Sequence, residues 1–71
     1  MQIDYLINER ILASLRNYPF INTDDIHIAV TDGNVTLRGT VSTPSDARVI
    51  LTESLLVKGV GTVIDKLDYR G

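Results

Sequence analysis

Two runs of alternating aliphatic residues, separated by a short turn sequence, constrain the fold of this chain more than any other feature. Aliphatic side chains occupy every second position of residues 26–30 and, interrupted by one glycine, of residues 35–41. The connection Asp32-Gly33-Asn34 consists of residues that tolerate the positive φ of a tight hairpin turn. One face of the hairpin is aliphatic, and the other is polar and rich in threonine. The sequence therefore predicts a sheet that is covered on one side only.

Two segments with helical periodicity flank this hairpin and can supply the cover. In the first, Ile7, Ile11 and Leu15 recur every fourth residue. Asp4 is placed to accept backbone N–H bonds as the N-cap of this helix. Pro19 and the polar run after it are expected to end the helix and form a loop.

The second helix has clearer boundary signals. Thr43 is its expected N-cap, Pro44 its first helical residue, and Asp46 an acid near the positive end of the helix dipole. Gly59 is expected to provide a left-handed C-terminal cap. The residues expected on the core face are Ala47, Ile50, Leu51, Ser54 and Leu55.

A last strand is expected over residues 62–69, with Val63, Leu67 and Tyr69 in one phase. Asp65 has the same phase, so either it lies where the sheet edge meets water or a bulge turns Ile64 inward. The order α-β-β-α-β predicts an α+β fold, a two-layer sandwich with two helices on one face of a three-stranded mixed or antiparallel sheet. We expect an antiparallel hairpin and a last strand parallel to the second, with the first strand between them.

Chain length and composition limit the classes of function that this chain can have. A chain of 71 residues has a thin core and no room for separate substrate and cofactor lobes. It contains no Cys and one His, which excludes a thiolate metal site and a cysteine nucleophile. Asp24, Asp25 and His27 look like a solvated loop before a strand, because adjacent Asp side chains diverge. We expect no enzymatic activity, no cofactor and no metal site.

The charge pattern also bears on partners and location. Seven basic and nine acidic residues are spread along the chain, which opposes affinity for a nucleic-acid backbone. No stretch approaches the roughly 18 apolar residues of a membrane span, and the N-terminus lacks the pattern of a signal peptide. As written, the chain is expected to be cytoplasmic. If it was cut from a longer precursor, the periplasm or cell envelope is expected instead.

Taken in order, these motifs resemble those of the BON domain, a small bacterial module. The motifs that carry the resemblance are the strand 26–30, the turn Gly33, the V-x-L-x-G-x-V pattern of residues 35–41, the helix from Pro44, the Gly59-Val60 pair, Val63 and Leu67. They cover nearly the whole chain, which we identify as a single BON-like domain of residues 1–71. Tyr69 and Asp65 depart from the family pattern, where an aliphatic residue and a small amide are usual.

The resemblance implies a non-catalytic binding module. BON domains are associated with phospholipid membranes, the cell envelope and protection against osmotic stress, and they occur in tandem or fused to other domains. A role in cation sensing is also known in the family. The competing interpretation of this chain is a regulatory or structural domain that binds a protein or a small solute or cation. RNA binding is a minor alternative, because the polar sheet face lacks paired aromatic residues.

Three glycines are expected to be structural. Gly33 belongs to the turn, and Gly59 to the end of the second helix. Gly39 lies in the core-facing phase of a strand, where the packing of a helix against the sheet explains it better than contact with a ligand. The Gly59-Val60-Gly61-Thr62 segment is no phosphate loop, because it follows a helix and precedes a strand.

The candidate binding surface lies on the second helix. Val49 and Leu56 fall nearly opposite the core stripe, and Arg48, Thr52 and Lys58 lie beside them. Such an apolar ridge with basic neighbours suits an anionic phospholipid membrane or a protein partner. The alternative is an ordinary surface on which two apolar residues happen to align.

Three residues outside the second helix could belong to the same binding surface. Leu6 would enlarge the surface, and Tyr18 and Phe20 either do the same or, as we favour, close the end of the core. Two apolar side chains are too few to hold a monomer on a membrane, since each contributes roughly 1.5–3 kcal/mol when fully buried. Homo-oligomers or tandem copies would then be needed for avidity.

Overall fold

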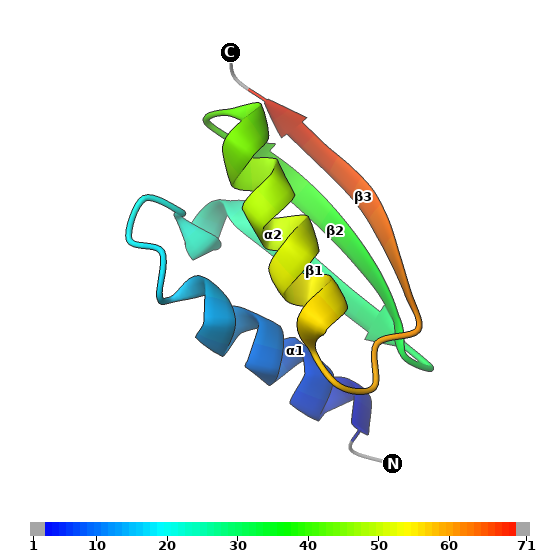
Figure 1. Cartoon of the computed structure of the whole chain (residues 1–71). Coiled ribbons are helices and arrows are strands. Elements are labelled where there is room, and N and C mark those ends of the chain that lie inside the picture. Colours follow the sequence, from blue (N-terminus) through cyan, green and yellow to red (C-terminus); the bar gives the residue numbers. More distant parts are fainter. Residues whose placement is uncertain (1–2, 70–71) are drawn as a thin grey trace.

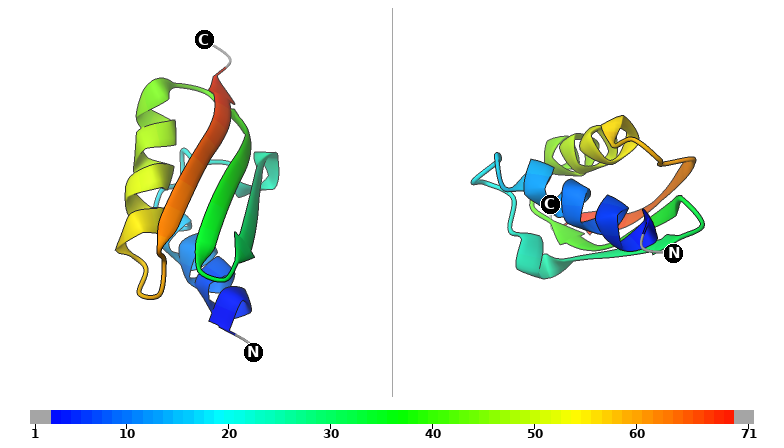
Figure 2. Two further views of the ribbon diagram at one scale, coloured as in Figure 1. Left: turned by 90° about the vertical axis from the view of Figure 1, so that its right-hand side faces the viewer. Right: turned by 90° about the horizontal axis from the view of Figure 1, so that it is seen from below.

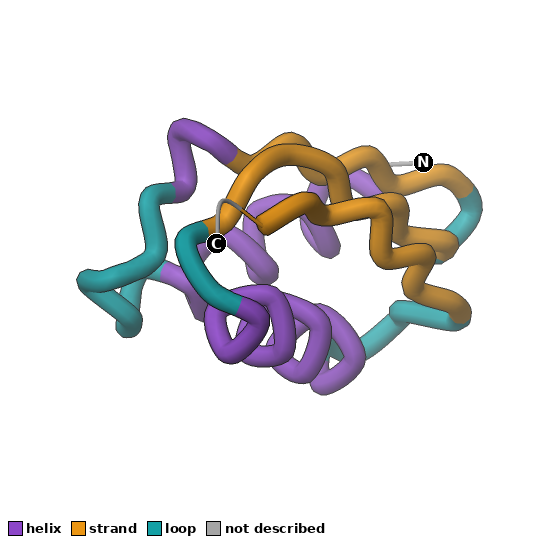
Figure 3. Tube along the Cα trace, turned by 90° about the horizontal axis from the view of Figure 1, so that it is seen from above, coloured by secondary structure: helices purple, strands orange, loops and turns teal. Residues whose placement is uncertain are grey.

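The computed structural model describes residues 3–69 and has the predicted α+β architecture. The elements in chain order are α1 (Ile3–Leu15), a short 3-10 helix η1 (Thr23–Asp25), β1 (Ile26–Thr31), β2 (Asn34–Val41), α2 (Pro44–Leu56) and β3 (Thr62–Tyr69). Both α-helices cover one face of the three-stranded sheet (Figure 1). The sheet and the helices form two layers when the molecule is turned (Figures 2 and 3).

The strand directions are as predicted, but the strand order is different. β2 pairs antiparallel with β1 and parallel with β3, so β2 and not β1 is the central strand. The expectation that β1 lies between the other two strands is therefore wrong. The physical reason lies in β2, whose Val35 and Leu37 are completely buried. A strand with this much apolar surface gains most from neighbours on both sides.

The hairpin turn and the start of α1 are tied together. Asp32 and Gly33 have φ values of 52° and 80°, as a two-residue turn with positive φ at both positions requires. The Asp4 carboxylate accepts hydrogen bonds from the backbone N–H of Asp32 (2.9 Å) and of Gly33 (3.1 Å). The predicted N-cap role of Asp4 is wrong, because α1 already includes Ile3 and the carboxylate binds the turn amides instead.

The start of α2 is as predicted, and its end is not. The Thr43 hydroxyl accepts the N–H of Asp46 at 3.2 Å, and Pro44 opens the helix. The helix ends at Leu56, with an extended Val57 as its C-cap. Gly59 does have a positive φ of 101°, but it lies in the loop to β3 and does not cap the helix.

The core lies between the helices and the sheet. Ser54 is its one buried polar side chain among residues 3–69, and its hydroxyl donates to the Ile50 carbonyl at 2.7 Å. Leu55, predicted on the core face, is instead 56% exposed, because α2 turns Ala47 and Ser54 toward the core. The buried apolar residues are Ile7, Ile11, Leu15, Ile21, Ile28, Val35, Leu37, Val41, Ala47, Ile50 and Leu67.

Gly39 has a different structural cause from the predicted one. Its φ is 125°, and a Cβ at this position would clash with the carbonyl oxygen of Asp25 and lie 3.0 Å from the Cα of Ile26. The backbone at the junction of η1 and β1, and not an α-helix packed on the sheet, therefore excludes a side chain here.

The position of Asp65 resolves the choice left open by the sequence. β3 is an edge strand, and Asp65 is exposed there. Its Oδ1 accepts the backbone N–H of Leu67 at 2.9 Å. Ile64 remains 44% exposed and is not turned into the core. Asp65 therefore lies where the sheet edge meets water.

Candidate functional site

The predicted surface residues of α2 do not form one continuous ridge. Arg48, Thr52, Leu56 and Lys58 are exposed, whereas Val49 is half-buried and packs against the core. Arg48, Val49 and Thr52 lie in a groove near the start of α2. Leu56 and Lys58 line a different hollow at the other end of the helix. The structure thus divides the predicted surface into two parts.

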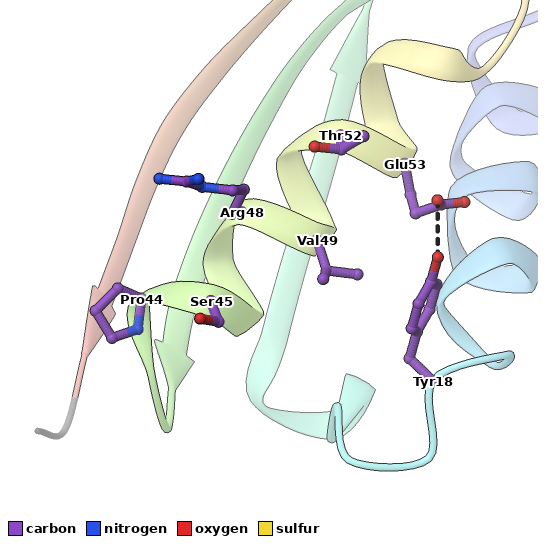
Figure 4. A pocket seen from close by; sticks show the side chains of 7 residues that line it. All are labelled: Tyr18, Pro44, Ser45, Arg48, Val49, Thr52 and Glu53. Carbon is purple, nitrogen blue, oxygen red and sulfur yellow. Dashed lines mark hydrogen bonds between the residues drawn. The ribbon is translucent and has the colours of Figure 1, made fainter.

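The groove lies between the first turns of α2 and the segment that follows α1. It is open to solvent, has a volume of about 460 Å³, and is lined by Tyr18, Pro44, Ser45, Arg48, Val49, Thr52 and Glu53. Figure 4 shows Arg48 on one side, the Tyr18–Glu53 pair on the other, and Val49 between them. We call these seven residues the α2 groove.

A hydrogen bond fixes one wall of the α2 groove. The Tyr18 hydroxyl donates to Oε2 of Glu53 at 3.0 Å (Figure 4). This hydrogen bond raises the pKa of Tyr18, and desolvation and the negative charge of Glu53 raise the same pKa further. The Phe20 ring meets Tyr18 edge-on with centroids 5.8 Å apart. Phe20 is exposed, so it does not close the end of the core as predicted. Tyr18 is half-buried and packs against the core.

The opposite end of the helix layer combines exposed apolar and basic side chains. Ile3, Leu6 and Leu56 are 50%, 48% and 73% exposed. Two shallow hollows at this end share Arg10 and Lys58 in their walls. We call these five residues the apolar-basic end. The sequence suggested Leu6, Leu56 and Lys58 for such a surface but missed Ile3 and Arg10, since nothing local indicates that the start of α1 lies beside the end of α2.

The uncovered face of the sheet has a different character. The strand register places His27 beside Arg38 and Arg38 beside Lys66, which forms a basic row across the three strands. Thr36 and Thr40 flank Arg38 along β2. The strand positions that alternate onto this face hold no Phe, Tyr or Trp, so the paired aromatic rings on which nucleic-acid bases stack are missing there.

The remaining chemistry of the described residues is limited. Within residues 3–69, no three His, Cys, Asp or Glu side chains come together in a way that could hold a metal ion. In the same range, neither helix has the length and hydrophobicity needed to cross a bilayer. Every buried side-chain nitrogen or oxygen of these residues has a hydrogen-bond partner. Two of the hollows lie elsewhere than on the two helices alone, one beside the η1 loop and the end of β2 and one beside the hairpin turn.

The fold is a small two-layer α/β domain with open hollows on its outer surface. The BON domain family model matches residues 4–71. The chain belongs to the BON domain family, a class of non-catalytic binding domains, as the order of its motifs predicts. A search of curated proteins found no match to the chain.

Proposed function

We propose that this domain attaches to phospholipid membranes that contain anionic lipid, through the apolar-basic end of its helix layer. The observation that carries the proposal is the exposure of Ile3, Leu6 and Leu56 beside two cationic side chains, Arg10 and Lys58. Apolar side chains at a membrane interface enter the acyl boundary, while neighbouring cations bind anionic headgroups. Membership of the BON family supports the same function. The proposed setting is the cell envelope under osmotic stress, which rests on the family alone.

Attachment by one domain is expected to be weak. Each side chain is only partly exposed, so each contributes less than the roughly 1.5–3 kcal/mol of complete burial. Each cation near an anionic surface contributes about 1 kcal/mol, and this contribution declines as salt is added. Tandem copies or a second membrane-binding element would strengthen the attachment through effective concentration.

Co-sedimentation with vesicles tests the proposal. We expect the chain to bind vesicles that contain phosphatidylglycerol, less strongly as the salt concentration rises. The double variant Leu6→Ser/Leu56→Ser should bind about tenfold more weakly, because the apolar contribution is lost. Neutralising both cations, with Arg10→Gln/Lys58→Gln, should weaken binding roughly 30-fold at low salt.

The matched control is Ile64→Ser, which removes an aliphatic side chain about as exposed as that of Leu6 (44% against 48%) from the uncovered sheet face. This variant should bind as the unmodified chain does. Equal loss in Ile64→Ser and Leu6→Ser/Leu56→Ser would contradict the assignment to the apolar-basic end. Absence of binding to any vesicle would contradict the membrane function and favour the protein- or solute-binding alternative.

A further inference from the structure

We propose that the α2 groove binds the zwitterionic headgroup of an ethanolamine phospholipid, with Arg48 holding the phosphate and Glu53 the ammonium. This inference deepens the proposed membrane function and rests on it. The α2 groove is lined mostly by α2, and the apolar-basic end is formed by the start of α1 and the end of α2. Both helices belong to one layer (Figure 1), so a domain lying on a bilayer by this layer can use both surfaces.

The two charges of the groove are kept apart. Arg48 and Glu53 are five residues apart on α2, which places them about 140° apart around a helix with 3.6 residues per turn. They are therefore not neighbours of the kind that pair along a helix. Val49 lies between them in the groove (Figure 4). A ligand that bridges both residues must carry a negative group and a positive group at opposite ends, so that it spans the groove across Val49.

Glu53 is positioned to receive a cation. It is half-buried, and its Oε2 accepts the Tyr18 hydroxyl at 3.0 Å. None of the hydrogen bonds found among residues 3–69 uses Oε1 of Glu53, so this oxygen can accept a donor from a ligand. The Tyr18 ring forms the adjacent wall and attracts a cation to its face. The tyrosine thus both orients the carboxylate and adds to the attraction.

The opposite wall suits a phosphate. Arg48 is exposed and carries a planar guanidinium, which matches the geometry of a phosphodiester. Ser45 and Thr52 add hydroxyl groups that can hydrogen-bond to phosphate or glycerol oxygens. The groove volume of about 460 Å³ is within the range typical of small-ligand sites, about 300–1,000 Å³.

The details of the wall favour ethanolamine over choline. A primary ammonium donates a charge-assisted hydrogen bond to a carboxylate. A quaternary ammonium cannot donate one, and it is recognised mainly by cages of several aromatic rings. Tyr18 is the one aromatic residue that lines the α2 groove in the described structure. Selectivity for ethanolamine over choline is therefore the distinctive consequence of the proposal.

Nuclear magnetic resonance tests this with soluble headgroups. Titration of the full chain with glycerophosphoethanolamine should move the backbone amide signals of residues 45–53 and of Tyr18 in a saturable way. Glycerophosphocholine, which is also zwitterionic, should bind about tenfold more weakly, because it lacks the hydrogen bond to Glu53. Equal shifts with both compounds, or shifts with neither, would overturn the proposal.

Variants assign the two contacts. Glu53→Gln should remove the preference for ethanolamine, and Arg48→Gln should weaken both headgroups about tenfold. Lys66→Gln is the matched control, because it neutralises an exposed cation on the uncovered sheet face and should leave the titration unchanged. Circular dichroism checks that each variant is folded. A wild-type response in Glu53→Gln would exclude the assigned ammonium contact.

Vesicles separate this proposal from the membrane function. Vesicles of phosphatidylcholine with or without phosphatidylethanolamine are both zwitterionic, and the groove predicts stronger binding when ethanolamine lipid is present. Binding to phosphatidylglycerol vesicles without any headgroup selectivity would overturn the groove assignment and leave the apolar-basic end intact. Selective headgroup shifts without vesicle binding would support the groove and contradict attachment through the apolar-basic end.

Discussion

Replacement of Gly39 by alanine is predicted to cause a large loss of stability. A Cβ at Gly39 would clash with the Asp25 carbonyl oxygen, and the φ of 125° is one that L side chains rarely adopt. Backbone strain of this kind costs about 1–3 kcal/mol, and overpacking costs about 1–3 kcal/mol more. The expected loss is therefore about 2–6 kcal/mol, against a total of about 4–11 kcal/mol for a chain of this length.

Urea unfolding followed by far-ultraviolet circular dichroism measures this loss. The matched control is Gly61→Ala, because Gly61 has no positive φ and its added Cβ would meet the nearest atoms at 3.8 and 3.9 Å, an ordinary contact distance. Both substitutions restrict the unfolded chain alike, so their difference isolates the folded state. Gly61→Ala should remain within about 1 kcal/mol of the unmodified chain. If Gly39→Ala is equally stable, the close approach of Asp25 is not a constraint on the fold.

Three further predictions follow from the hydrogen bonds. Asp4→Ala should lower the free energy of unfolding in urea by about 1–2 kcal/mol, because two turn amides lose a charged acceptor; an unchanged midpoint would contradict this. Thr43→Ala should cost about 1 kcal/mol by the same measurement, while Thr43→Ser, which keeps the hydroxyl, should cost little. The raised pKa of Tyr18 means that its bond to Glu53 stabilises the fold fully below the unfolded tyrosine pKa of about 10, and that this stability is lost as pH rises through the folded pKa. As the pH rises above about 10, the free energy of unfolding should therefore fall less in Tyr18→Phe than in the unmodified chain. If the free energies of unfolding of the two proteins fall in parallel with pH, the Tyr18–Glu53 bond makes no such contribution.

Local signals predicted much of this fold. The hairpin turn at Gly33 and the cap at Thr43 follow from chemistry within a few residues, and both are confirmed. The bounds of β3 were also predicted, since alternation and flanking glycines mark the strand. Each of these features depends on backbone preferences that nearby side chains satisfy.

Features that depend on distant contacts could not be predicted in the same way. The central strand of a sheet depends on burial summed over all elements. The local pattern therefore did not distinguish β2 from β1, and the prediction that β1 is central is wrong. Asp4 is a residue type that commonly caps helix N-termini, but the backbone amides it binds lie 28 and 29 residues away in the sequence. The partner of Tyr18 is 35 residues away. The last of these contacts holds the segment after α1 against α2 and so forms one wall of the α2 groove.

The hydrogen bond from the Leu67 amide to Asp65 has a consequence beyond its own strand. β3 is an outer strand that pairs with β2 on one side only. Its other edge is unpaired in the described part of the chain, and such an edge can accept a strand of another chain that extends the sheet. Because Asp65 already occupies this amide, an incoming strand would have to displace a carboxylate before it could add to the ribbon. At high concentration, copies of the chain are therefore less prone to associate through their β3 edges. The helix layer of each copy then remains accessible to other partners.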